Sequence, residues 1–182
     1  NSEPNYGDFA MTVRGEDPVV AFSEYNSQGL VDLYVKRWVE DDWIGSTTTV
    51  NINPTLIGEY PSLVVKPGTT PVPHITWQEG GEVYVKRLVQ RLNGPRWERV
   101  GTTLDADSNP DNLPRIALNS SGNPVVAWRE LGNVHVSQWR SGVWQPMAGA
   151  LNTSSTTGST QYPPAIAQRS GQLFAAWDED VG

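Results

Sequence analysis

The sequence has no cysteine among its 182 residues. A disulfide framework and a thiolate metal site are therefore excluded, and the cellular compartment cannot be inferred from redox chemistry. No stretch approaches the roughly 20 consecutive apolar residues that a membrane-spanning helix needs. We accordingly expect no membrane insertion.

Basic residues are also few, since 13 Lys and Arg stand against 20 Asp and Glu, for a net charge of −7. This balance disfavours binding to the nucleic-acid backbone, so no nucleic-acid partner is expected. The only two histidines, His74 and His135, lie far apart in the sequence. They indicate neither a histidine metal cluster nor a Ser-His-Asp arrangement.

The residues that are abundant favour strands. The chain has 14 Pro, 17 Gly and 8 Trp, and proline and glycine interrupt helices whereas tryptophan packs well on pleated surfaces. A hydrophobic content of 37% is enough to line a core. The chain begins at Asn1 without a signal-peptide pattern, which suggests a processed product or a piece of a longer protein.

A repeat of about 50 residues runs through the chain. One of its aromatic positions recurs at spacings of 55, 51 and 49 residues, at Phe22, Trp77, Trp128 and Trp177. Each complete copy contains four short segments that alternate between apolar and polar residues, separated by Gly, Asn, Ser or Pro turn signals.

Four strands per repeat is the composition of a β-propeller blade. We predict an all-β chain of antiparallel four-stranded blades, with three full blades and the first two strands of a fourth. The single segment 1–182 divides into blades at about 8–60, 61–113 and 114–163 and a partial blade at 164–182. A β-solenoid is the structural rival, but its coils are usually shorter than about 50 residues.

Certain repeated motifs carry a family resemblance. They include Pro114-Arg-Ile-Ala117, Gly122-Asn-Pro-Val-Val-Ala-Trp-Arg-Glu130, Val83-Tyr-Val-Lys-Arg87 and Trp97-Glu-Arg-Val-Gly101. Nearly the whole chain resembles the tandem propeller repeats of bacterial secreted or surface proteins, and is loosely similar to sialidase-type propellers. The resemblance implies the fold. The sialidase Asp-box, Ser-x-Asp-x-Gly-x-x-Trp, is absent, and the catalytic residues of that family have no counterparts here.

Three and a half blades are too few for a closed propeller, which typically has four to eight. The open faces and the unpaired strand edge need a partner. We expect either a homo-oligomer, with a symmetric dimer the favoured form, or the missing remainder of a longer propeller.

Two sets of repeated side chains are candidate ligand contacts. The aromatic set is Trp77, Trp128 and Trp177, and the acidic set two residues further on is Glu79, Glu130 and Glu179. Repetition argues against catalysis, because an active site needs different groups converging at one place. The structural alternatives are packing between blades for the tryptophans, and ion pairing or loop capping for the glutamates.

One loop has oxygen ligands at alternate positions, namely Asp105, Asp107, Asn109 and Asp111. Such spacing can gather carboxylates around Ca²⁺, although the glycine and the later glutamate of an EF-hand are missing. A solvated loop between blades is the favoured interpretation, and no other cofactor is indicated.

We predict a non-enzymatic binding or interaction module, secreted or on the surface of a bacterium, with carbohydrate or a protein surface as ligand. The alternatives are a glycosidase-like or sialidase-like propeller enzyme and a purely structural repeat of a large surface protein. An enzyme would show unrepeated acids converging in a central pocket, whereas a lectin would show equivalent aromatic-lined sites in every blade.

Overall fold

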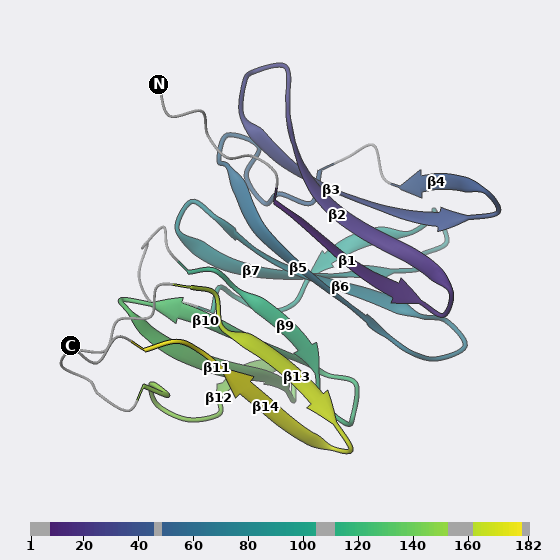
Figure 1. Ribbon diagram of the computed structural model, residues 1–182. Coiled ribbons are helices and arrows are strands. Elements are labelled where there is room, and N and C mark those ends of the chain that lie inside the picture. The colour runs from purple at the N-terminus through teal and green to yellow at the C-terminus, as the bar shows by residue number, and fades with distance from the viewer. Residues whose placement is uncertain (1–7, 46–48, 105–111, 153–161, 180–182) are drawn as a thin grey trace.

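The computed structural model describes residues 8–45, 49–104, 112–152 and 162–179, and every regular element in them is a strand (Figure 1). The strands form three four-stranded antiparallel sheets, called blades 1 to 3, and a two-stranded partial blade 4. Blade 1 contains β1 (Phe9–Arg14), β2 (Asp17–Tyr25), β3 (Val31–Val39) and β4 (Asp42–Gly45). Blade 2 contains β5 (Gly58–Lys66), β6 (Val72–Glu79), β7 (Glu82–Val89) and β8 (Arg96–Arg99). Blade 3 contains β9 (Arg115–Leu118), β10 (Pro124–Glu130), β11 (Asn133–Arg140) and β12 (Val143–Pro146), and the partial blade contains β13 (Ala165–Arg169) and β14 (Gln172–Ala176).

This arrangement confirms the predicted fold class. Within each blade the strands follow one another in sequence order, so every connection is a hairpin. Several hairpins turn through two residues with positive φ, as at Leu131 (φ 50°) and Gly132 (φ 77°) between β10 and β11. Such turns match the right-handed twist of the strands that they join.

The first strand of each blade lies on the inner side of the stack. β1 packs beside β5, β5 beside β9, and β9 beside β13, while β4, β8 and β12 are the last strands of their sheets. In Figure 1, β1, β9 and β13 point the same way. Residues at the start of these inner strands therefore gather at one end of the stack, and residues at their ends gather at the other.

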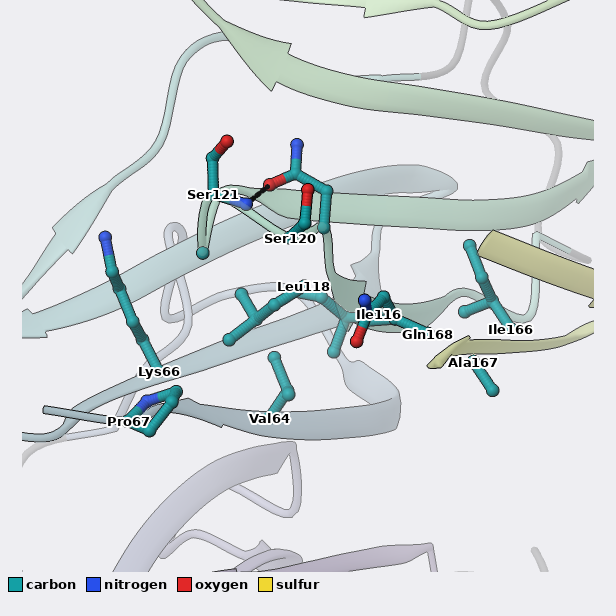
Figure 2. Close-up of a pocket in the computed structure, with 13 residues that line it drawn as sticks. Val64, Lys66, Pro67, Ile116, Leu118, Ser120, Ser121, Ile166, Ala167 and Gln168 are labelled. Carbon is teal, nitrogen blue, oxygen red and sulfur yellow. Dashed lines mark hydrogen bonds between the residues drawn. The ribbon is translucent and has the colours of Figure 1, made fainter. Parts of the chain in front are cut away.

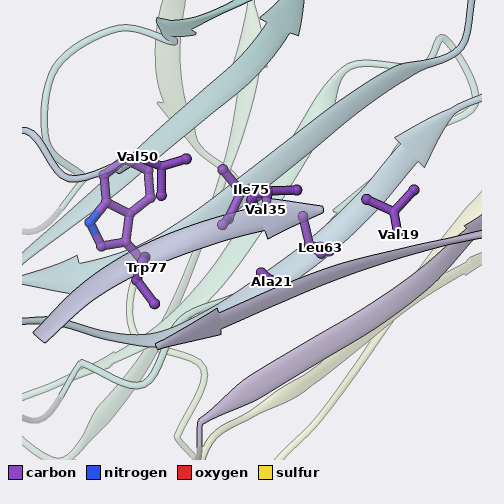
Figure 3. Close-up of a cluster of buried hydrophobic side chains, with 8 residues drawn as sticks. Val19, Ala21, Val35, Val50, Leu63, Ile75 and Trp77 are labelled. Atoms are coloured by element: carbon purple, nitrogen blue, oxygen red, sulfur yellow. The ribbon is translucent and has the colours of Figure 1, made fainter. Parts of the chain in front are cut away.

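The hydrophobic core lies between the blades. Between blades 1 and 2, Val19, Ala21 and Val35 pack against Ile75 and Trp77 (Figure 3). A second cluster joins Val83 and Val85 of blade 2 to Ile116, Val126 and Trp128 of blade 3. Because both faces of an inner blade are buried in this way, its strands carry apolar residues on both sides.

Blade 1 has an apolar face that no described residue of the chain covers. Phe9 and Met11 on that face are 72% and 65% exposed, and Val13 and Trp43 are exposed as well. Met11 lies opposite Val20 in the register of blade 1, as Leu63 lies opposite Ile75 in blade 2. Leu63 and Ile75 face blade 1 in the buried core, so the open face of blade 1 is built like one that receives a preceding blade.

No helix in the described part of the chain is long and apolar enough to cross a membrane.

Candidate functional site

The predicted ligand contacts in blade 2 lie inside the protein. Trp77 is 0% exposed and Glu79 is 1% exposed. The Trp77 indole donates a hydrogen bond to Glu79 Oε2 at 2.8 Å, and the same carboxylate accepts bonds from the backbone N–H groups of Ile52 and Asn53. Glu79 therefore caps the connection that leads from blade 1 to blade 2, which is the loop-capping alternative, and neither side chain is open to a ligand.

Blade 3 repeats part of this arrangement. The indole of Trp128, which is also buried, donates a 3.1 Å bond to Glu130 Oε2. In the partial blade, Trp177 and Glu179 are half-buried at the end of β14. A ligand role for these last two residues stays a prediction.

The predicted calcium loop, with Asp105, Asp107, Asn109 and Asp111, lies outside the described residues. Among the residues described, no three His, Cys, Asp or Glu side chains gather as a metal site would require. His74 and His135 sit in different blades. His135 stacks on Trp128 with ring centroids 5.6 Å apart, taking the place that Tyr84 has beside Trp77.

A cavity of about 680 Å³ opens along the inner strands where blades 2, 3 and 4 meet, and we call it the axial cavity (Figure 2). Val64, Leu118 and Ile166 form its apolar surface, and polar atoms come from Lys66, Gln168 and the turn at residues 119–122. Asn119 Oδ1 holds that turn by accepting bonds from the N–H groups of Ser121 and Asn123, both at 3.0 Å.

Lys66 packs closely on this turn. A Cβ atom added to Gly122, whose φ is +72°, would lie 2.6 Å from Lys66 Cε. No carboxylate lines the axial cavity. Its mixture of apolar walls with amide, hydroxyl and ammonium groups suits a neutral ligand rich in hydroxyls.

The opposite end of the inner strands carries a group of charged side chains from three blades. Asp8 directly precedes β1, Glu59 is the second residue of β5, and Arg115 begins β9. We call these three residues the axial charged group. Ser62 Oγ accepts a 3.2 Å bond from the N–H of Ile116, which ties β9 to β5 beside this group.

The backbone at this end of the inner strands has an unusual conformation. Asp8 Oδ2 accepts a 3.1 Å bond from the N–H of Tyr60, which joins blade 1 to blade 2 across 52 residues of sequence. Tyr60 has a φ of 53°, and the pairing of β5 with β6 shifts between Glu59 and Ser62. Left-handed non-glycine residues and β-bulges both occur preferentially at functional sites, where a bulge redirects a side chain.

The electrostatics of the group are coupled through Asp8. Burial raises the pKa of Glu59 above its ordinary value, and the neighbouring charge of Asp8 raises it further. Burial lowers the pKa of Arg115, and Asp8 opposes that change. Arg115 also donates from Nη1 to the carbonyl oxygen of Pro114 at 2.9 Å, which steadies the guanidinium. A carboxyl group with a raised pKa beside a second carboxylate and a guanidinium is an arrangement that can take part in proton transfer.

The axial charged group was missed by the sequence analysis, which concentrated on repeated positions. The signal that could have found it lies in the positions that do not repeat. The residues around the start of each inner strand differ between copies, while the strands themselves repeat. Unrepeated acids that converge near the axis are the feature expected of an enzyme.

No protein-family model matches the sequence, and no curated protein matches it. Solved structures do resemble the fold. An exo-β-1,3-galactanase from Clostridium thermocellum superposes with a TM-score of 0.59 at 12% identity, over 93% of this chain and 41% of that one. A protein assigned as an exo-β-1,3-galactanase from Bifidobacterium bifidum s17 superposes with a TM-score of 0.55 at 12% identity, over 94% of this chain and 61% of that one. A fucose lectin from Kordia zhangzhouensis, solved with methyl-fucoside, superposes with a TM-score of 0.48 at 10% identity, over 79% of this chain and 99% of that one.

The chain thus spans less than two thirds of either galactanase. The expectation that it is not an enzyme is contradicted, because its fold is shared with two proteins described as glycan-cleaving enzymes. Neither galactanase is a sialidase, so the sialidase part of the resemblance stays a prediction. The likeness at 12% identity shows the fold and does not transfer an activity.

Proposed function

We propose that this chain is part of a carbohydrate-active propeller and that it binds saccharide along its inner strands. The axial charged group carries the proposal. Asp8, Glu59 and Arg115 come from three different blades, and each can hydrogen-bond sugar hydroxyls. The axial cavity, with its apolar walls and its amide and hydroxyl groups, supplies a second contact region along the same strands.

Glycoside hydrolysis is the second candidate, favoured by the raised pKa of Glu59 beside Asp8. Glycosidases use one protonated carboxyl group to protonate the leaving glycosidic oxygen and a second carboxylate on the other side of the bond. In that scheme Glu59 donates the proton as the C–O bond breaks. Asp8 accepts a proton from the water that attacks the anomeric carbon, and Arg115 binds a hydroxyl of the sugar.

The test is calorimetric titration of the chain with a neutral β-1,3-linked galacto-oligosaccharide, the linkage named for the two galactanases. We expect measurable binding that is weakened by both Asp8→Asn and Arg115→Gln. Glu16→Gln, in the exposed turn between β1 and β2, is the matched control and should bind as the wild type does. Chromatography of the products then tests hydrolysis, which Glu59→Gln should abolish while leaving binding largely intact. Equal binding by all variants would overturn the site.

We also propose that the open face of blade 1 is covered in the working protein by a blade of the same repeat, supplied by a second copy of this chain. The register equivalence of Met11 with Leu63 supports this, because the face is patterned to receive a blade. A symmetric dimer is the commonest closed assembly. The alternative outcome is that the remainder of a longer chain covers the open face of blade 1.

A bacterial setting, secreted or on the cell surface, is proposed with this function. The support is the fold shared with two bacterial carbohydrate-active enzymes.

A further inference from the structure

A separate cavity of about 530 Å³ opens between blades 1 and 2, and we call it the first inter-blade cleft. Blade 1 forms one side through β3 and β4, and blade 2 forms the other through β6, β7 and β8. Trp97, Leu88 and Pro73 provide apolar surface. The cleft is distinct from the axial cavity, with which it shares no lining residue.

Every ionisable residue along this cleft is basic, namely Lys36, Arg37, Lys86 and Arg96. Arg37 and Lys86 lie opposite Val19 and Ile75, which are buried between blades 1 and 2, so their side chains face the cleft. Lys36 lies opposite Val20 on the open face of blade 1, and Arg96 lies opposite Val89 on the other face of blade 2. The protein as a whole has a net charge of −7, so a cleft lined only by cations stands out from its surroundings. A concentration of one sign of charge in a cleft with apolar walls raises the local concentration of ligands of the opposite sign.

The two lysines are already engaged. Lys36 Nζ lies 5.7 Å from the ring centroid of Phe22. Lys86 Nζ donates to the backbone carbonyl oxygens of Val50 at 2.6 Å and Asn51 at 3.2 Å, and burial lowers its pKa. Two of the three ammonium protons of Lys86 are used in this way, and one is left for a ligand.

The two arginines differ in their partners. Arg96 Nε lies 3.3 Å from Glu98 Oε1, so its charge is partly balanced. Arg37 is half-buried opposite Val19 and has no hydrogen-bond or ion-pair partner within the described ranges. A guanidinium presents five donors in a rigid fork, so Arg37 is the strongest available anion contact in the cleft.

The pattern recurs between blades 2 and 3. A cleft of about 270 Å³ there is lined by Lys66, His74, Arg87 and Trp139, again without an acid. Arg87 lies opposite His74 as Arg37 lies opposite Val19, so the two arginines have the same register. The third copy has Gln138 at this position, opposite Val125. The repeat thus carries an arginine in two copies and a neutral amide in the third.

We propose that the inter-blade clefts bind acidic saccharides, with a carboxylate or sulfate group on Arg37 in the first cleft and on Arg87 in the second. The fork of a guanidinium matches the two oxygens of either anion, and Trp97 offers an apolar surface for the sugar ring in the first cleft. This inference rests on the proposed carbohydrate function. It adds a second class of site, between blades, and a charge preference that the axial charged group does not have.

The experiment compares trigalacturonate with a neutral galactotriose by calorimetric titration at low and moderate salt. We expect the acidic sugar to bind more tightly, with an affinity that falls as salt rises. Arg37→Gln copies the residue of the third repeat and should weaken trigalacturonate binding about tenfold, while Arg37→Lys should recover part of the loss. Arg140→Gln, exposed and outside both clefts, removes the same charge and is the control. Sodium sulfate as competitor separates a site for a sugar acid from a site for any small anion.

The outcomes separate this inference from the function on which it rests. Neutral sugar bound in a manner sensitive to Asp8→Asn, with no preference for the acidic sugar, would overturn the cleft proposal alone. Failure of both sugars to bind would overturn the cleft proposal and the axial site together. Equal losses in Arg37→Gln and Arg140→Gln, or complete displacement of trigalacturonate by an equimolar amount of sulfate, would also contradict it. Circular dichroism of each variant confirms that the blades remain folded.

Discussion

Glu79 Oε2 accepts a 2.8 Å hydrogen bond from the indole of Trp77, which lies two residues earlier on the same strand, β6. The same carboxylate binds the N–H of Ile52 at 2.9 Å and the N–H of Asn53 at 2.5 Å. One buried anion thus connects β6 to the segment that links the first two blades. Its donors compensate for the loss of water around the charge.

Glu79→Gln should lower the free energy of unfolding by about 2 kcal/mol, because an amide nitrogen replaces an oxygen that accepts hydrogen bonds in a buried place. Urea unfolding followed by tryptophan fluorescence measures the change. Glu16→Gln in the exposed turn should change the free energy by less than about 0.5 kcal/mol. Equal effects of the two substitutions would show that Glu79 does not hold the blades together.

Gly101 allows two tryptophans of blade 3 to approach blade 2. Its φ is +73°, and an added Cβ would lie 2.5 Å from Trp139 Cζ3 and 2.9 Å from Trp144 Cδ1. Trp144 Nε1 donates to the carbonyl oxygen of Val100 at 2.9 Å in the same place. Gly101→Ala therefore combines backbone strain with a steric clash.

The matched control is Gly142→Ala, because Gly142 has a φ of +83° and no atom within 4 Å of an added Cβ. We expect the control to cost about 1 kcal/mol of unfolding free energy from strain alone, and Gly101→Ala to cost about 2 kcal/mol more. Thermal and urea unfolding measure both. Similar values for the two variants would contradict the packing of the tryptophans on Gly101.

His74 should make stability depend on pH. It is 4% exposed, and burial lowers its pKa from 6.5 to about 4, with Arg87 and Lys66 adding to the decrease. The unfolded chain therefore binds a proton between pH 6.5 and 4 that the folded chain does not bind. The contribution of the neutral His74 imidazole to the free energy of unfolding is fully present above pH 6.5. It is lost as the pH falls toward 4, by up to about 3 kcal/mol.

The measurement is the free energy of unfolding at intervals from pH 7.5 to 4, for the wild type and for His74→Gln. The difference between the two curves should shrink as the pH falls, because the variant has no imidazole to protonate. His135→Gln serves as the comparison. A constant difference across the range would rule out the buried neutral imidazole.

Closure of the open face of blade 1 can be tested by light scattering coupled to size-exclusion chromatography. We expect the wild type to form a dimer and Met11→Glu to shift it toward monomer, since Met11 is 65% exposed on that face. Leu92→Glu introduces the same charge at an exposed apolar residue in the turn between β7 and β8 and should leave the dimer intact. A monomeric wild type would overturn the proposal of a second copy.

The fold was predictable from the sequence because blade strands are local. Alternation over a few residues and turn signals such as Ser141-Gly142 define hairpins without long-range information. The role of Glu79 was predicted only as one of several alternatives, because its hydrogen-bond donors, Ile52 and Asn53, belong to the preceding copy. The axial charged group was not predicted, because the meeting of Asp8, Glu59 and Arg115 depends on how the blades stack. A period of about 50 residues does not encode that stacking.

The most direct test of the account is the pKa of the Glu59 side-chain carboxyl, measured by carbon-detected NMR titration. We predict a value above that of an ordinary glutamate, which decreases in Asp8→Asn because the neighbouring charge is removed and only the effect of burial is left. Addition of a galacto-oligosaccharide should perturb the same resonance. An ordinary pKa that is unchanged by Asp8→Asn and by sugar would contradict the proposal that the inner strands of separate blades form one saccharide site.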